Sequence, residues 1–142
     1  MNPLDDCFAK GLLKKTPKNI TLAKEDLKQA EFFLNEAEDL LKLKKKEMAC
    51  LALYNAVFHA ARALLFKDGI KERSHYCLQK YIEEEYGKSS QFSAEQIALF
   101  DILRGLRQEI QYGVSKVKFE ENLAELFDQA EKFIEKSKSL VG

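Results

Sequence analysis

The most apolar segment of the chain, from Ala49 to Phe66, constrains the fold more than any other feature. Its only strongly polar residues are Asn55, His59 and Arg62. Strong helix formers dominate the segment, which predicts a helix over residues 47–67. The segment approaches the length of a membrane span, but three polar residues in its middle and a mean hydropathy of -0.36 for the chain favour a buried central helix in a soluble protein.

The rest of the chain shows the same helical character. Apolar residues recur at steps of three and four, for example at Leu27, Ala30 and Leu34. No Val, Ile or Thr-rich alternating run indicates a strand. We therefore predict an all-α fold, an antiparallel up-down bundle of four long helices plus one shorter helix. The predicted helices cover residues 21–45, 47–67, 75–86, 94–112 and 119–140, with Gly69 ending the second, Ser74 capping the third, and Ser93 and Gln96 forming a capping box at the fourth.

The 142 residues fit a single domain with an extension at one end. Residues 1–20 have weak periodicity and are predicted to form an N-terminal arm, and residues 21–142 form the bundle. Phe8, Leu12 and Leu13 could hold this arm against the domain or against a second subunit.

Charge and cysteine content limit the classes of function. Lys plus Arg equals Asp plus Glu at 23 each, so binding to nucleic acid would need a local basic patch. The first residues lack the basic start and apolar run of a secretion signal, which predicts a cytoplasmic protein, and we expect no membrane partner. Cys7, Cys50 and Cys77 are odd in number and not spaced as metal ligands, so we expect reduced thiols and no metal. The sequence has no Gly-rich phosphate loop, HExxH motif or nucleophile elbow, so we expect no cofactor.

The polar residues of the central helix lie on one line. At roughly 100° per residue, Asn55, His59 and Arg62 fall within an arc of about 60°. A buried Arg without a partner is costly, so this line must face solvent, a carboxylate or a cleft. Two interpretations remain open, namely structural contacts to neighbouring helices and a binding groove.

A second candidate lies on the helix predicted over residues 94–112. Arg107 stands at the border between its apolar and polar faces. A guanidinium there can reach the edge of a groove while its stem stays packed.

Two stretches resemble the HEPN superfamily, named for nucleotide binding in higher eukaryotes and prokaryotes, and within it the small prokaryotic UPF0332-type group. They are residues 54–65, followed by Gly69 and the pair Ser74-His75, and residues 103–113 around Arg107. The resemblance implies a helical bundle that forms a homodimer and associates with RNA or nucleotides. Many members of the superfamily are metal-independent ribonucleases, and several are toxins encoded beside a minimal nucleotidyltransferase.

The chain departs from the arginine motif of those ribonucleases. In the family the Arg is followed after four to six residues by a His, whereas here Gln111 and Tyr112 follow Arg107. Gln cannot titrate, and Tyr titrates near pH 10, so we expect intrinsic nuclease activity to be reduced or absent.

The sequence therefore predicts a protein that binds a nucleotide, RNA or a minimal nucleotidyltransferase, as in toxin–antitoxin systems. One alternative is a metal-independent endoribonuclease in which Arg107 acts with His59 or Tyr112, and another is a purely structural interaction protein. In toxin relatives a tyrosine close after the motif accepts a nucleotide, so Tyr112 is a candidate for modification as well as an ordinary packed helix-end tyrosine. The predicted groove is lined by Asn55, His59, Arg62, Arg107, Gln111 and Tyr112.

Overall fold

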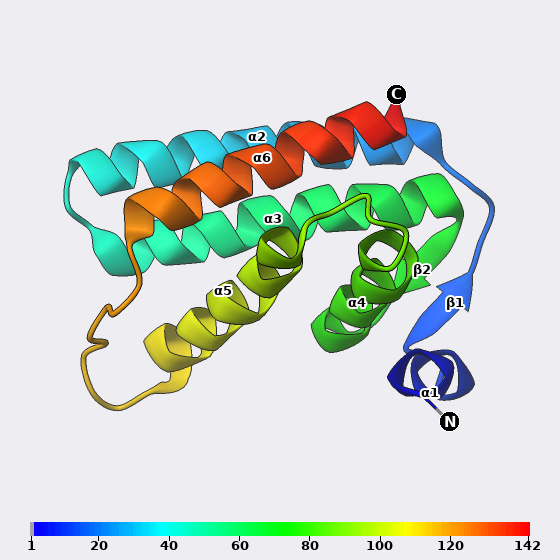
Figure 1. The fold of residues 1–142 in the computed structure, drawn as a ribbon, viewed down its shortest axis with the longest axis horizontal. Helices are drawn as coiled ribbons and strands as arrows, with labels where there is room; N and C mark the ends of the chain where they lie inside the picture. The colour runs from blue at the N-terminus through cyan, green and yellow to red at the C-terminus, as the bar shows by residue number, and fades with distance from the viewer. Residues whose placement is uncertain (1) are drawn as a thin grey trace.

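The computed structural model describes residues 2–142 and confirms the all-α fold. Four long helices form the bundle, and shorter elements occupy the N-terminal region and the middle of the chain (Figure 1). In chain order the elements are α1 (Pro3–Ala9), β1 (Leu13–Lys15), α2 (Ile20–Lys42), α3 (Lys46–Asp68), β2 (Ile70–Glu72), α4 (His75–Ile82), the π-helical turn η1 (Glu83–Gly87), α5 (Ala94–Tyr112) and α6 (Leu123–Val141).

Helix α3 is the central helix, as its sequence predicts. It forms an antiparallel hairpin with α2, and α6 packs along both (Figure 1). Thirteen of its residues are buried, including Leu53, Leu64 and Leu65. The helix is long and apolar enough to cross a membrane, but 72% of its most apolar window is buried inside the fold, as in the core helix of a bundle.

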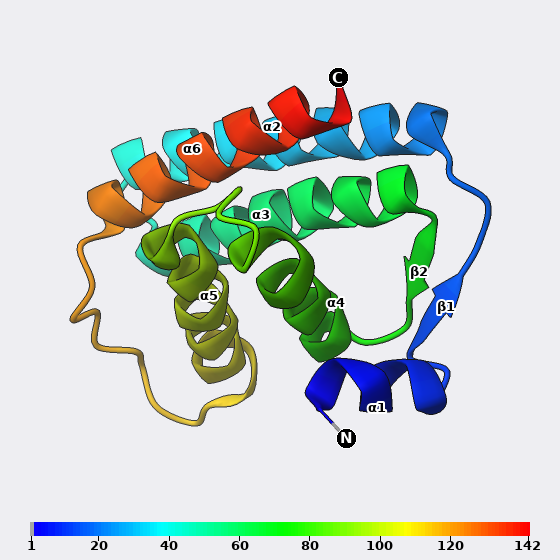
Figure 2. The ribbon, with the colours of Figure 1, turned by 45° about the vertical axis from the view of Figure 1, so that its right-hand side comes forward.

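Helices α4 and α5 pack against α3, and α5 also contacts α6. In Figure 2 both lie below the layer formed by α2, α3 and α6, and the chain rises toward that layer along α4 and descends from it along α5. Helix α5 begins with the predicted capping box, in which the Ser93 side chain accepts from the Gln96 amide and the Gln96 side chain accepts from the Ser93 amide. This arrangement brings the inner faces of α4 and α5 toward the middle of α3.

Three helix boundaries differ from those predicted by three residues or more. The first long helix ends at Lys42 instead of at residue 45. The α-helix that starts at His75 ends at Ile82, and the chain continues as the π-helical turn η1. The last helix starts at Leu123, where the Asn122 side chain accepts from the Glu125 amide, instead of at Phe119. Apolar spacing alone did not reveal this cap.

The N-terminal region forms structure that the sequence analysis did not predict. Strand β1 pairs antiparallel with β2, with Leu13 opposite Glu72. Leu13 is buried, and Phe8 and Leu12 pack against the core. Each strand has only three residues, which is too short for an alternating pattern to be recognised.

The expectation of reduced thiols at Cys7 and Cys77 was wrong. These residues form a disulfide between α1 and α4, with Cα atoms 5.8 Å apart. They are separated by 70 positions in sequence, so their proximity depends on the tertiary fold and not on a local motif. Cys50 is a free, buried thiol, and burial raises its pKa to about 12.

Candidate functional site

Asp26 of α2 is the partner of the polar line on α3. His59 Nδ1 lies 2.8 Å from Asp26 Oδ1, and Arg62 donates from Nε to Oδ2 at 2.7 Å and from Nη2 to Oδ1 at 2.9 Å. Asp26 is only 4% exposed. Of the two interpretations left open by the sequence, the geometry of His59 and Arg62 fits structural contacts between α2 and α3.

The charges in this contact stabilise one another. Burial acts to raise the pKa of Asp26, but the hydrogen bonds from His59 and Arg62 outweigh it and hold that pKa below its usual value. The hydrogen bond to Asp26 raises the pKa of Arg62. The Asp26 carboxylate is therefore ionised and paired at neutral pH.

A second polar contact joins α3 to α4. The Tyr54 hydroxyl and His75 Nδ1 share a hydrogen bond of 2.7 Å. The His75 ring stacks on Phe58 with centroids 4.2 Å apart. The Tyr54 and His75 rings are held by packing as well as by their hydrogen bond. Tyr54 is itself buried in the central helix, and His75 stacks on Phe58, which is also buried there.

Arg107 of α5 lies against the Tyr54 ring of this contact. Its Cζ atom lies 5.1 Å from the centroid of the Tyr54 ring, a cation–π arrangement. The guanidinium is half-buried, and within residues 2–142 no carboxylate pairs with it. Without a carboxylate partner among these residues, its hydrogen-bond donors remain available to a bound group.

The environment fixes the protonation of this contact. Burial lowers the pKa of His75, and the nearby charges of Arg107 and Arg62 lower it further. Burial raises the pKa of Tyr54, although Arg107 and Arg104 partly oppose this. At neutral pH the imidazole is uncharged and the phenol keeps its proton.

One turn before Arg107, a second arginine contacts a second tyrosine. Arg104 Cζ lies 5.6 Å from the centroid of the Tyr76 ring, and Lys80 Nζ lies 5.3 Å from the same centroid. We call the set of residues formed by Tyr54, His75, Tyr76, Arg104 and Arg107 the basic–aromatic cluster. It draws side chains from α3, α4 and α5 together on one side of the central helix.

The structure brings together only part of the predicted groove. Arg107 does reach α3, but through Tyr54, while His59 and Arg62 turn to Asp26 on α2. Asn55 is half-buried. Gln111 and Tyr112 are exposed at the end of α5, and Tyr112 is 67% exposed.

Sequence reasoning missed four members of the basic–aromatic cluster and the buried Asp26. Tyr54 stands within the apolar run of the central helix, where only Asn55, His59 and Arg62 were singled out. His75 directly follows the predicted Ser74 cap. The pair Ser74-His75, already part of the family resemblance, was the available signal for His75.

The chemistry of the cluster suits an anion. A planar guanidinium can donate two hydrogen bonds to a pair of phosphate oxygens, and exposed tyrosine rings accept stacked bases. Among residues 2–142, no group of three or more His, Cys, Asp or Glu side chains lies close enough to hold a metal ion.

Comparisons with known proteins give the family of the chain. A family model described as "HEPN domain" matches residues 23–140. The chain is also similar to a protein of Archaeoglobus fulgidus named UPF0332 protein, with 29% identity over 119 residues, which is 81% of this chain and 91% of the relative.

Proposed function

Because the chain belongs to the HEPN domain family, we propose that it binds RNA or a nucleotide through the basic–aromatic cluster, with Arg107 as the main phosphate contact. The membership is consistent with a function related to nucleotides or RNA. The single observation that carries the proposal is the Arg107 guanidinium, held against the Tyr54 ring without a carboxylate partner among the described residues. A paired guanidinium would have to give up its carboxylate before it could bind phosphate.

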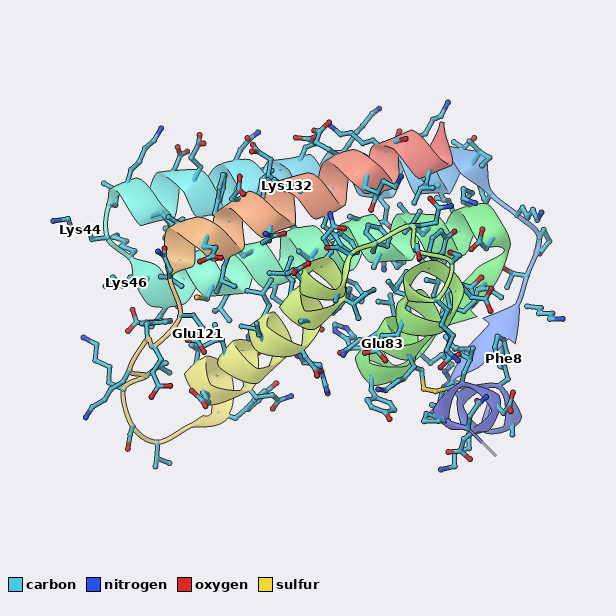
Figure 3. All side chains as sticks on the ribbon, viewed as in Figure 1. Phe8, Lys44, Lys46, Glu83, Glu121 and Lys132 are labelled. Atoms are coloured by element: carbon cyan, nitrogen blue, oxygen red, sulfur yellow. A yellow bond between two sulfur atoms is a disulfide. The ribbon has the colours of Figure 1, made fainter. Side chains whose placement is uncertain are left out.

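The test is RNA and nucleotide binding measured by fluorescence anisotropy at low salt. Arg107→Ala should weaken binding of a labelled single-stranded RNA or of ATP about tenfold, the effect of one charge-assisted phosphate contact. Lys132→Ala is the matched control, since it also removes one positive charge but lies exposed on α6 (Figure 3). Equal binding by both variants would exclude Arg107 as the contact.

The proposal includes a protein partner for the same chain. Tyr112 is exposed at the end of α5, where an enzyme could reach its hydroxyl. A minimal nucleotidyltransferase encoded beside this gene, incubated with the protein and ATP, should add nucleotide mass to Tyr112, and Tyr112→Phe should prevent it. An unchanged mass with the wild-type protein would reject modification.

We also propose that the protein acts as a homodimer, as the family resemblance implies. Light scattering should give twice the mass of the 16.3 kDa chain. A single-chain mass at all concentrations tested would reject this part of the proposal.

His75 favours a second candidate function, metal-independent RNA cleavage. The sequence offered His59 or Tyr112 as the proton-transfer group, but His59 binds Asp26, whereas His75 lies close enough to Arg107 for that charge to lower its pKa. In this reaction uncharged His75 takes the proton of a ribose 2′-hydroxyl, and the 2′-oxygen attacks the adjacent phosphorus. The bond from phosphorus to the 5′-oxygen breaks, and the leaving oxygen takes up a proton, which gives a 2′,3′-cyclic phosphate and a 5′-hydroxyl.

Cleavage assays in EDTA separate binding from catalysis. If His75 is the base, the rate should rise with pH and level off below the ordinary histidine pKa of 6.5, because the pKa of His75 is lowered. His75→Gln should reduce the rate at least about 100-fold, while His59→Gln should leave it within a few-fold. RNA that binds but stays intact between pH 6 and 9 would reject catalysis and leave the binding proposal standing.

A further inference from the structure

The basic–aromatic cluster offers more possible ligand contacts than the single phosphate contact of Arg107. We propose that Tyr76 is a stacking platform for an unpaired base, and that Arg104 and Arg107 hold two successive phosphates beside it. The ligand class is then single-stranded RNA of at least two nucleotides. This inference rests on the proposed binding function and makes it more specific.

Tyr76 is placed as a binding residue would be. It belongs to the first turn of α4, between half-buried His75 and buried Cys77, yet its own side chain is 42% exposed. Arg104 and Lys80 lie near its ring, so positive charge surrounds an aromatic surface that is open to solvent. Proteins that bind single strands combine these two features, since bases stack on the ring and the cations attract the backbone.

The two arginines repeat along α5. Arg104 and Arg107 are three residues apart, so their side chains leave the same face of the helix about 4.5 Å apart along its axis. Each guanidinium lies against a tyrosine of a different helix. Arg104 lies against Tyr76 of α4, and Arg107 lies against Tyr54 of α3. Because the two guanidiniums are held at different tyrosine rings, each can contact a phosphate of its own.

Arg104 is only weakly engaged inside the chain. Its hydrogen bond to Asp101 is long, at 3.4 Å, and the Asp101 side chain is 65% exposed. Its Nε has no hydrogen-bond partner in the part of the chain that the structure describes. A phosphate oxygen can therefore replace Asp101 at low cost.

The platform explains why the ligand must be single-stranded. A stacking surface can only receive a base that has left its own stack and its pairing partner, and a duplex presents backbone and groove edges instead. The contribution of a stacked base is sequence-tolerant, because every base has an aromatic face. We therefore expect discrimination between single and double strands without strong sequence preference.

The experiment measures anisotropy with three probes of equal length: a labelled single-stranded RNA, its duplex, and an abasic oligomer with the same sugar–phosphate backbone. Tyr76→Leu should weaken binding of the single strand about tenfold, and Tyr76→Phe should bind as the wild type does. On the abasic oligomer Tyr76→Leu should cause no further loss. Phe32→Leu is the matched control, because Phe32 is another exposed aromatic residue, 53% exposed, but lies on α2.

The outcomes distinguish the stacking role of Tyr76 from the proposed RNA or nucleotide binding on which it rests. Equal binding of the single strand by Tyr76→Leu and wild type, or equal binding of duplex and single strand by the wild type, overturns the stacking platform while Arg107-dependent binding survives. No binding of any probe by the wild type overturns the proposed function itself. If Tyr76→Leu does not fold, the wild-type protein still decides, because it must bind the abasic oligomer about tenfold more weakly than the RNA.

Discussion

Among the residues described, Asp26 is the only charged one that is almost fully buried, and it joins α2 to α3. Its two oxygens accept three hydrogen bonds from His59 and Arg62. Removing one member of such a contact is costly, because the remaining charge stays desolvated without compensation.

Asp26→Asn should therefore lower the free energy of unfolding by about 2 kcal/mol, at the lower end for a buried pair because Arg62 is partly exposed. Urea denaturation measures this value. The neighbouring Glu25→Gln is the control, since its ion pair with Lys28 is exposed and should contribute less than about 0.5 kcal/mol. Equal stabilities of the two variants would mean that the Asp26 contact is not stabilising.

At the scale of single residues, the sequence shows which residues are unusual, but it shows less well which residues they contact. The polar line on α3 was visible because three polar residues interrupt an apolar run. Its partner Asp26 was not, since one aspartate on an amphipathic helix resembles any surface carboxylate. Tyr54 and His75 come from different helices, so their hydrogen bond depends on the packing of α4 against α3.

At the scale of elements, the turn between α3 and β2 depends on Gly69. Its φ is +77°, in the left-handed region, and an added Cβ would lie 2.5 Å from the Thr16 carbonyl oxygen. The glycine thus lets the chain end α3 and turn into β2 while the segment after β1 passes close by. Gly105, within α5, has nothing within 4 Å of an added Cβ.

These two glycines predict effects of opposite sign. Gly69→Ala should lower the free energy of unfolding by about 1–3 kcal/mol, because of the left-handed backbone and the contact with Thr16. Gly105→Ala should raise it by about 0.5–1 kcal/mol, because alanine favours a helix interior. Thermal denaturation of both variants tests this pair, and a shift in the same direction for both would contradict it.

The disulfide between α1 and α4 is the second feature at this scale. It closes a loop of 70 residues, for which restriction of the unfolded chain contributes up to about 4 kcal/mol. A reductant should therefore lower the midpoint of urea unfolding for the wild type and for Cys50→Ala, which keeps the bond. Cys7→Ser should already have the lower midpoint and show no response to reductant. A wild-type midpoint that reductant leaves unchanged would argue against the bond.

The helices themselves followed from local signals. Apolar spacing, the capping box at Ser93 and the glycine after α3 predicted the four long helices, with α5 correct at both ends. The strands β1 and β2 and the disulfide were missed because each joins segments far apart in the sequence. No local pattern indicates such pairs.

For the whole molecule, the balance of 23 positive and 23 negative residues decides how it can attract RNA. Without net charge, no long-range field adds to the local contacts. Binding should then depend on salt only through the phosphates that Arg104 and Arg107 contact, and not through a general attraction of the surface.

The logarithm of the binding constant for single-stranded RNA should fall against the logarithm of salt concentration with a slope of about -1.4, from two phosphates at about 0.7 each. Arg107→Ala should make the slope shallower by about 0.7. Anisotropy titrations over a range of KCl concentrations measure both values. A much steeper slope that Arg107→Ala leaves unchanged would indicate contacts spread over the surface.

The disulfide between Cys7 and Cys77 also determines whether a single cut in the backbone separates the chain into two fragments. Lys44, in the turn between α2 and α3, and Lys46, the first residue of α3, point outward (Figure 3). Lys44 has a φ of 59°, and this exposed turn is a natural place for trypsin to cut. That cut falls between the two cysteines, so the severed halves stay covalently joined through buried sulfur atoms. The nicked protein remains one molecule on a denaturing gel until a thiol is added.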